Sequence, residues 1–450
     1  MNGHGGGGAE TIRVVGGNRL DGEVTVTGAK NSALKLMAAS LLATGRTILA
    51  GVPDILDVRI MAELLRRLGC DVAHDPEAGT VGIDVPEQPG HRADYDLVRA
   101  MRASISVLGP LVARVGEADV ALPGGDAIGS RGLDLHVDGL RAMGAEVHVD
   151  HGYLVATAPP GGLRGALVPL AFPSVGATEN LLMAAVLASG TSEIDNAARE
   201  PEIDDLVQML TVMGARISGV GTTRLVVEGV ETLRPAQHTV VPDRVVAGTW
   251  CFAAAVAGGD VLVRGARHQH LRLALDKLRL AGVEVSPDAE GVRVVARRRP
   301  RAVDIATLPY PGFPTDLQPL ALTMCAVGEG SAVVTENLFE ARFRFAHELV
   351  RLGADLTIDG HHVLVRGVPR LSGAPVEASD IRAGAALVVA GLAAEGETVV
   401  TGVEHVDRGY ADLVGQLAGL GADVRRERAP ADVPFGPGTA GPQAGRPPGH

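Results

Sequence analysis

A short helix ending repeats six times along the chain, and this repeat constrains the fold more than any other feature. The copies read LLRRLGCDV, GLRAMGAEV, MLTVMGARI, KLRLAGVEV, ELVRLGADL and QLAGLGADV. Their glycines are Gly69, Gly144, Gly214, Gly282, Gly353 and Gly421, at steps of 75, 70, 68, 71 and 68 residues. A glycine here is typical of a helix C-terminus, and the β-branched or aliphatic residues after it predict a strand. The repeat therefore predicts six α/β units of about 70 residues.

A second set of helices alternates with the first and is apolar on nearly all sides. These segments cover residues 32–45, 104–116, 180–190, 248–259, 317–330 and 384–396. A helix that is apolar all round is buried, so each of them is expected inside a domain. Six units most simply form two α/β domains of three repeated units, with a junction near residues 235–245.

Charge, cysteine usage and hydropathy exclude several classes of protein. The formal net charge of −12 argues against a nucleic-acid-binding surface, although a local basic pocket for an anionic substrate is compatible with it. Cys70, Cys251 and Cys325 have no metal-binding spacing and are interpreted as reduced core residues. No signal peptide and no apolar run of membrane-spanning length is evident. We therefore expect a cytoplasmic protein with no metal and no membrane partner, and self-association stays open.

Ionisable or polar residues stand at the start of every apolar helix. They are Lys30 with Asn31, Arg102, Ser174 with Glu179, Asp243 with Arg244, Thr315 with Asp316, and Asp380 with Arg382. Helix capping explains the carboxylates, Ser and Asn, but a cation at the positive end of a helix is unfavourable unless an anion joins it. Lys30 is one of only three lysines among 41 basic residues, which suggests a compact charge is required there. Helix starts that face each other across two domains predict an anion-binding cleft.

A glycine-rich stretch, LPGGDAIGSRGLDLH (residues 122–136), follows the second apolar helix and carries Asp126 and Arg131. By itself it fits an ordinary turn with a surface ion pair. Its position in the repeat predicts instead a lid over the cleft. His136 and His405 are candidate general acids, although single histidines of this kind are more often structural.

Nine motifs in this order resemble the UDP-N-acetylglucosamine 1-carboxyvinyltransferases, a family of enolpyruvyl transferases. They are GAKNSALKLMAASLLA, MRASISVLGPLVAR, LPGGDAIGSRGLDLH, SVGATEN, NAAREPEI, FPTDLQP, TENLFEARF, SDIRAGAALVVAG and HVDRGY, between about residues 11 and 425. The resemblance implies two inside-out α/β barrels, each of three repeated units with buried helices. It implies that residues 10–29 plus 242–425 form one domain and residues 30–241 the other. Residues 1–9 and the Pro/Gly-rich residues 426–450 are expected to be disordered tails.

The resemblance also implies the reaction and the residues that perform it. The 3'-hydroxyl of UDP-N-acetylglucosamine adds to C2 of phosphoenolpyruvate, and phosphate is then eliminated, with no metal or organic cofactor. Lys30, Arg131 and Arg408 are expected to hold phosphoenolpyruvate, with Asn31 beside Lys30. The residues expected to bind the nucleotide sugar are Arg102, Arg131, Gly132, Leu133, Asp134, Leu135, Ser174, Val175, Gly176, Asp316, Leu338 and Arg382. Asp316 is the expected base and Asp126 the expected acid.

Two alternatives stay open beside this function. One is a related enolpyruvyl transferase that acts on another hydroxyl, such as that of shikimate 3-phosphate or of a sugar in specialised metabolism. The other is a noncatalytic nucleotide-sugar sensor, against which the presence of Lys30, Asp126, Asp316 and Arg408 argues. Phe172 and Pro173 replace residues that contact UDP in some members of the family, so the sequence does not decide the nucleotide contacts there.

Asp126 leads to the first prediction. Many members of the family have a cysteine here, and that thiol is the target of the epoxide antibiotic fosfomycin. A carboxylate keeps the acid role but lacks the nucleophilic thiolate. We expect that fosfomycin does not inactivate this protein, and time-dependent covalent loss of activity would contradict this expectation.

Overall fold

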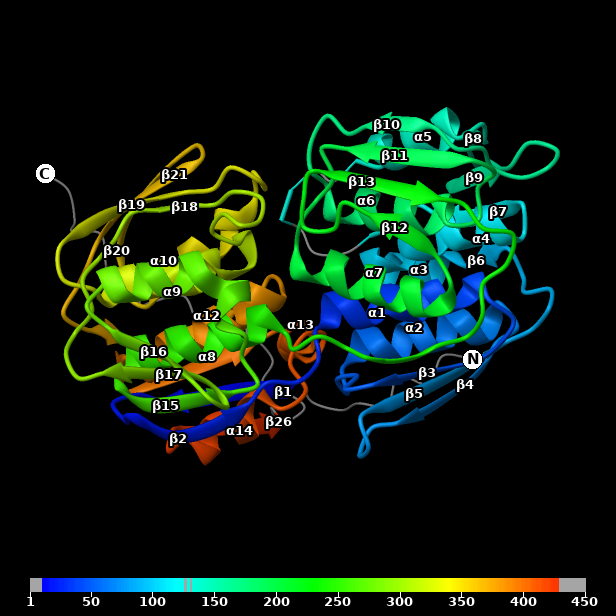
Figure 1. Cartoon of the computed structure of the whole chain (residues 1–450). Helices are drawn as coiled ribbons and strands as arrows, with labels where there is room; N and C mark the ends of the chain where they lie inside the picture. The colour runs from blue at the N-terminus through cyan, green and yellow to red at the C-terminus, as the bar shows by residue number, and fades with distance from the viewer. Residues whose placement is uncertain (1–9, 125–127, 130–131, 429–450) are drawn as a thin grey trace, which may run out of the picture.

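The computed structural model describes residues 10–124, 128–129 and 132–428. Two α/β lobes lie side by side in Figure 1, one coloured blue to green and the other mainly green to orange. In both lobes the strands lie toward the outside and helices lie between them. The structure therefore has the predicted class of two inside-out α/β barrels.

The apolar helices form the interior of the lobes. They are α1 (Lys30–Ala39), α4 (Leu108–Arg114), α6 (Val175–Ala185), α8 (Arg244–Ala257), α10 (Gln318–Val327) and α12 (Ile381–Leu392). Every residue of α10 and α12 is buried, which confirms the interpretation of helices apolar on all sides. The segment 104–116 starts differently from the expectation, because residues 102–107 form the 3-10 helix η2 (Arg102–Val107) before α4 begins.

The amphipathic helices end at the repeated glycines. They are α2 (Leu56–Arg67), α5 (Asp134–Ala142), α7 (Pro201–Met213), α9 (Arg272–Leu280), α11 (Ala346–Arg351) and α14 (Leu413–Gly419). All six repeated glycines have φ between 87° and 112°, a backbone conformation that residues with a Cβ atom rarely adopt. A strand follows each of them, so the repeat is a structural unit of helix, turn and strand.

Each unit contributes to one four-stranded sheet with the same pairing, one parallel pair followed by two antiparallel pairs. The three sheets of the first lobe have these orders: β14 (Gln237–Thr239), β3 (Gly45–Ala50), β5 (Thr80–Val85), β4 (Asp71–Asp75); β6 (Arg92–Ala93), β7 (Glu117–Ala121), β9 (Tyr153–Thr157), β8 (Glu146–Asp150); and β10 (Leu167–Pro169), β11 (Thr191–Asp195), β13 (Arg224–Glu228), β12 (Arg216–Ser218). The three sheets of the second lobe are β2 (Leu20–Thr25), β15 (Gly259–Arg264), β17 (Gly291–Ala296), β16 (Glu284–Asp288); β18 (Ile305–Ala306), β19 (Ser331–Thr335), β21 (His362–Arg366), β20 (Asp355–Asp359); and β23 (Pro375–Glu377), β25 (Glu397–Thr401), β1 (Glu10–Val15), β26 (Asp423–Arg428).

The remaining elements are short. They are α3 (Tyr95–Ala100), α13 (Val403–Asp407), the 3-10 helices η1 (Ser40–Leu42), η3 (His268–Leu271), η4 (Thr315–Leu317) and η5 (Arg342–Phe345), and the strand pair β22 (Leu371–Ser372) with β24 (Ala394–Glu395). Three of them lie next to the cavity described below. Asp316 of η4, Arg342 of η5 and Arg408 directly after α13 line this cavity.

The N-terminal strands belong to sheets of the C-terminal half. β1 pairs with β25 and β26, and β2 pairs with β15. The buried apolar residues form two clusters, one from residues 12–26 and 245–424 and the other from residues 29–241. The predicted domain boundaries, residues 10–29 plus 242–425 and residues 30–241, stay a proposal, which this division of the buried residues supports.

The predicted start of the C-terminal tail is wrong by three residues. Residues 426–428 continue β26, and their partners in β1 are residues 10–12. Arg426 and Arg428 also form ion pairs with Glu10, so this end of the chain gains ladder hydrogen bonds and charge pairs that its composition does not reveal. Residues 1–9 and 429–450, expected as disordered tails, lie outside the described residues.

The close approach of α4 and α6 leads to a prediction on stability. A Cβ atom at Gly109 in α4 would lie 2.2 Å from the backbone oxygen of Asn180 in α6. We expect Gly109→Ala to lower the free energy of unfolding by about 1 to 3 kcal/mol, because the two helices must move apart. Chemical denaturation of the full chain measures this effect.

Gly419 in α14 provides the matched control. A Cβ atom there meets no atom within 4 Å, and the position is exposed. Gly419→Ala should therefore raise stability by up to about 1 kcal/mol through helix propensity. Equal effects of the two substitutions would contradict the close-packing argument.

Candidate functional site

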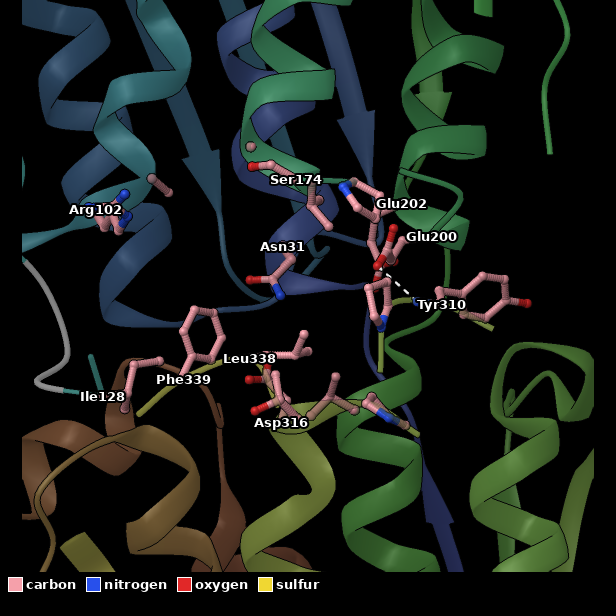
Figure 2. A pocket seen from close by; sticks show the side chains of 18 of the residues that line it. Asn31, Arg102, Ile128, Ser174, Glu200, Glu202, Tyr310, Asp316, Leu338 and Phe339 are labelled. Atoms are coloured by element: carbon pink, nitrogen blue, oxygen red, sulfur yellow. Dashed lines mark hydrogen bonds between the residues drawn. The ribbon is translucent and has the colours of Figure 1, made fainter. Parts of the chain in front are cut away.

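The starts of all six apolar helices converge on one cavity between the two lobes. The cavity has a volume of about 490 Å³. Its lining includes Lys30, Ser174, Arg244 and Arg382 from the starts of α1, α6, α8 and α12, and Arg102 and Asp316 from the 3-10 helices η2 and η4 that precede α4 and α10. Figure 2 shows Asn31 and Ser174 on one side of this cavity and Asp316, Leu338 and Phe339 on the other. The predicted cleft of helix starts is therefore a property of the fold.

The lining carries an excess of positive charge in a protein that is acidic overall. Among the described residues it contains seven cationic side chains and five carboxylates. The cations are Lys30, Lys35, Arg102, Arg244, Arg342, Arg382 and Arg408, and the carboxylates are Asp57, Asp134, Glu200, Glu202 and Asp316. A cavity with this balance favours an anionic ligand.

Asp57 joins two of these cations that come from different lobes. Its carboxylate lies 2.8 Å from Nζ of Lys30 and 3.0 Å from Nε of Arg408. Asp57 is only 1% exposed, and it belongs to the first turn of α2. Burial lowers the pKa of Lys30, whereas the negative charge of Asp57 opposes this shift. One buried carboxylate thus holds two cations, one from each lobe, at the cavity wall.

Asp316 lies opposite, between two buried arginines. Its Oδ1 accepts a hydrogen bond from Arg342 at 3.1 Å, and its Oδ2 accepts one from Nε of Arg382 at 3.3 Å. Burial alone would raise the pKa of Asp316, but Arg382 and Arg342 outweigh it, so the pKa lies far below its ordinary value. Asp316 is therefore a carboxylate throughout the neutral pH range.

A third charged group closes one end of the cavity. Nε of Arg244 lies 3.0 Å from Glu202, and its guanidinium lies 5.5 Å from the centre of the Tyr310 ring. The backbone N–H of Tyr310 donates to Glu200 at 3.4 Å, the contact drawn in Figure 2. Burial raises the pKa of Glu200, and Arg244 opposes this rise.

The structure brings most of the predicted site residues together. Those that line the cavity are Lys30, Asn31, Arg102, Gly132, Asp134, Leu135, Ser174, Val175, Gly176, Asp316, Leu338, Arg382 and Arg408. Leu133 does not line it, because its partly buried side chain packs against the core of residues 29–241. Asp126 and Arg131 lie outside the described residues. Phe172 and Pro173, which the sequence left undecided, are part of the lining.

Capping accounts for only some of the polar residues at the helix starts. Ser174, Asp243 and Asp380 accept hydrogen bonds from backbone N–H groups in the first turns of α6, α8 and α12. Asn31 and Asp316 make no such bond, because Asn31 lies inside α1 and Asp316 lies in the 3-10 helix η4 that precedes α10. Their side chains are thus available to the cavity.

Several lining residues were missed by sequence reasoning. Asp57, Glu200 and Glu202 stand in the first turns or at the starts of amphipathic helices, where a carboxylate is an ordinary feature. Lys35 is one of the three lysines of the chain, and no role was assigned to it from the sequence. In the structure it lies 3.1 Å from Glu179 and donates to the backbone oxygen of Asn31 at 3.0 Å. The scarcity of lysine was the signal that could have found it.

Comparisons with known proteins agree with this geometry. The sequence model of the family described as EPSP synthase (3-phosphoshikimate 1-carboxyvinyltransferase) matches residues 14–417. A UDP-N-acetylglucosamine 1-carboxyvinyltransferase from Nocardia farcinica is 58% identical over 422 residues, which cover 93% of this chain and 99% of the relative. Proteins of the same name from Mycobacterium leprae and Mycobacterium tuberculosis are 55% and 54% identical, each over 93% of this chain and 99% of the relative. The chain belongs to the UDP-N-acetylglucosamine 1-carboxyvinyltransferase family of enolpyruvyl transferases.

Solved structures of enolpyruvyl transferases share the fold. The enolpyruvyl transferase NikO from Streptomyces tendae superposes with a TM-score of 0.83 and 27% identity, covering 94% of this chain and all of the other. An EPSP synthase from Acinetobacter baumannii superposes with a TM-score of 0.72 at 18% identity, over 93% of this chain and all of that one, which shows the fold alone.

Three further features of this enolpyruvyl transferase concern metal ligands, membrane-spanning helices and cysteines. In the described part of the chain, no group of three or more His, Cys, Asp or Glu side chains is arranged to hold a metal ion. No helix among the same residues has the length and apolar character needed to cross a membrane. The three cysteines are buried and none lines the cavity, and burial raises the pKa of Cys251 to about 12.

The pair of Lys35 and Glu179 leads to a prediction on pH. Burial raises the pKa of Glu179 from 4.5 to about 7, although Lys35 opposes the shift. Between these values the folded protein retains a proton that the unfolded chain releases, so this group lowers stability as the pH rises. Relative to wild type, Glu179→Gln should gain on the order of 1 to 3 kcal/mol in free energy of unfolding between about pH 5 and pH 7.

The measurement is urea unfolding of both proteins across this pH range. Glu231→Gln, which changes an exposed carboxyl of the same lobe, is the matched control and should follow wild type. A difference between wild type and Glu179→Gln that stays constant with pH would show that Glu179 does not retain its proton.

Proposed function

We propose that this chain is a cytoplasmic enzyme of peptidoglycan synthesis that transfers the enolpyruvyl group of phosphoenolpyruvate to the 3'-hydroxyl of UDP-N-acetylglucosamine. One observation carries the proposal. In a chain 54–58% identical to enzymes of that name, two cations held by Asp57 face a carboxylate held by two arginines across one cavity.

The cations of the cavity suit phosphoenolpyruvate, which carries a carboxylate and a phosphate. Lys30 and Arg408 are proposed to bind these groups. Arg131 is proposed to bind them as well, on the family resemblance alone. The described lining carries seven cations against five carboxylates, so an anionic substrate improves the charge balance of the cavity. Asn31, directly after Lys30, supplies an amide beside the reacting carbon.

The nucleotide sugar is assigned to the wall formed by η2, α5 and α6. Arg102 offers a guanidinium to the diphosphate, Ser174 offers its hydroxyl, and Val175 and Gly176 in the first turn of α6 offer backbone N–H groups. Gly132, Asp134, Leu135, Leu338 and Arg382 line the cavity and complete the proposed contacts, together with Arg131, which is assigned from the family resemblance alone. Phe172 and Pro173 supply apolar surface at the same wall.

The proposed reaction has two steps. In the first, the 3'-hydroxyl oxygen forms a bond to C2 of phosphoenolpyruvate, Asp316 takes the hydroxyl proton, and Asp126 donates a proton to C3. In the second, the carboxylate that Asp126 has become takes a proton from C3, the C2–C3 double bond forms, the bond from C2 to the phosphate oxygen breaks, and phosphate leaves. The arginines around Asp316 keep it ionised and therefore ready to accept a proton, although they also weaken it as a base.

Phosphate release tests this function. Full-length protein incubated with phosphoenolpyruvate should release phosphate when UDP-N-acetylglucosamine is added, and should not do so with shikimate 3-phosphate. Asp316→Asn should lower kcat by about 100-fold or more, the contribution expected of a positioned general base. Asparagine keeps an oxygen for the buried Arg342 and Arg382, so the fold should persist.

Asp359→Asn is the control, because Asp359 is an exposed residue at the end of β20 in the same lobe. It should turn over like wild type. Release with shikimate 3-phosphate alone would replace the proposed acceptor. Full activity of Asp316→Asn would instead remove Asp316 from the mechanism.

A further inference from the structure

The orientation of one buried amide, that of Asn180 in α6, is set by two backbone groups. Its Oδ1 accepts a hydrogen bond from the N–H of Gly109 at 2.8 Å, and its Nδ2 donates to the carbonyl of Ile105 at 3.0 Å. A backbone N–H can only donate and a carbonyl can only accept, so the amide cannot be turned around without losing both bonds. Asn180 is 1% exposed, so bulk solvent does not reach the amide to replace them.

This orientation determines which nitrogen of His136 carries the proton. Nδ2 of Asn180 also lies 3.0 Å from Nδ1 of His136. Because Nδ2 is a donor, Nδ1 must accept and carries no proton. Burial, reinforced by Arg102, lowers the pKa of His136 to about 4, so its ring is neutral near pH 7. The single ring proton is therefore on Nε2.

The Nε2–H group faces the cavity at the start of α6. His136 is 5% exposed and lines the cavity, and a Cβ atom at Gly176 would lie 3.6 Å from its Cε1 and Nε2. The structure gives Nε2 no hydrogen-bond acceptor among the residues it describes. The charged groups that face the ring are Arg102 from η2 and Asp134 from α5.

A purely structural histidine does not account for this arrangement. The network satisfies Nδ1 but gives Nε2 no acceptor among the described residues, and the ring lies beside Gly176 in the first turn of α6. An anion at this helix start could accept from Nε2 and from the backbone N–H groups of the same turn. Figure 2 shows Arg102 and Ser174 on this wall.

We propose that His136 donates its Nε2–H to a diphosphate oxygen of the nucleotide sugar, and that Asn180 is the positioning residue that holds His136 in this tautomer. The inference rests on the proposed function for the identity of the ligand. It adds a neutral, fixed donor to the cations of the site. A neutral donor binds an anion without adding a further buried charge to the cavity.

Two substitutions of His136 test the contact, because they place an amide nitrogen at different distances from the backbone. The amide nitrogen of Gln can take the place of Nε2, whereas the amide of Asn reaches only the place of Nδ1. In the full chain, His136→Gln should bind UDP-N-acetylglucosamine in calorimetric titration within a few-fold of wild type. His136→Asn should bind about 10-fold or more weakly, the loss expected for a hydrogen bond to a charged group. With saturating phosphoenolpyruvate, KM should rise in the same variant while kcat changes little.

Nitrogen NMR tests the role of Asn180 without substrate. In protein with ¹⁵N-labelled histidine, the signals of His136, assigned by their absence in His136→Gln, should show an unprotonated Nδ1 and a protonated Nε2. In Asn180→Asp the new carboxylate should draw a proton onto Nδ1. A proton on Nδ1 in wild type would overturn the proposed tautomer.

The outcomes separate this inference from the proposed function. Equal affinity of both His136 variants and wild type would remove the contact, even if the enzyme turns over. Equal weakening by Gln and Asn, with lower thermal stability, would show a structural role and would also overturn the inference. Tight binding of UDP-N-acetylglucosamine that is lost only in His136→Asn, without phosphate release by wild type, would support the contact and reject the proposed reaction.

Discussion

The buried carboxylate of Asp57 is the interaction on which the site depends. It lies within 3.0 Å of a lysine from one lobe and an arginine from the other, so it fixes the cavity wall and also ties the lobes together. Removing one member of such a group leaves a buried charge without compensation, which costs more than the net value of the pair. The described lining as a whole carries more cations than carboxylates, and this excess favours an anion in the cavity.

The opposite wall repeats this arrangement of one carboxylate between two cations. There Arg342 and Arg382 hold the carboxylate of Asp316. Each functional charge therefore has a rigid, buried partner that sets its position before a substrate arrives. Charges that are already oriented need little reorganisation during reaction, which is how such a cavity stabilises developing charge. The neutral donor of His136 extends this arrangement, since hydrogen bonds to Asn180 rather than an ion pair orient it.

Much of the fold was predictable because its signals are local. A glycine with positive φ follows each amphipathic helix because the backbone turns there. The alternate helices are apolar on all sides because they are buried. The site was predictable in part. Lys30, Asp316 and Arg408 stood out through their positions in the repeat and through the family motifs. Asp57 and Glu202 did not, because a carboxylate in the first turn of a helix looks the same whether or not it faces a cavity. Leu133 was assigned to the site by its neighbours, yet it packs against the core.

The sequence by itself determined the six units, the buried helices and the family, because periodicity, glycine positions and motifs are written along the chain. Tertiary structure alone decided which charges meet, since Lys30 and Arg408 are almost the whole chain apart and touch the same carboxylate. It also decided that Glu10 pairs with Arg428, so that strand pairing extends into the expected tail. The same is true of the tautomer of His136, which depends on two backbone groups of another helical segment. Packing brings such distant groups together, and no local pattern records the result.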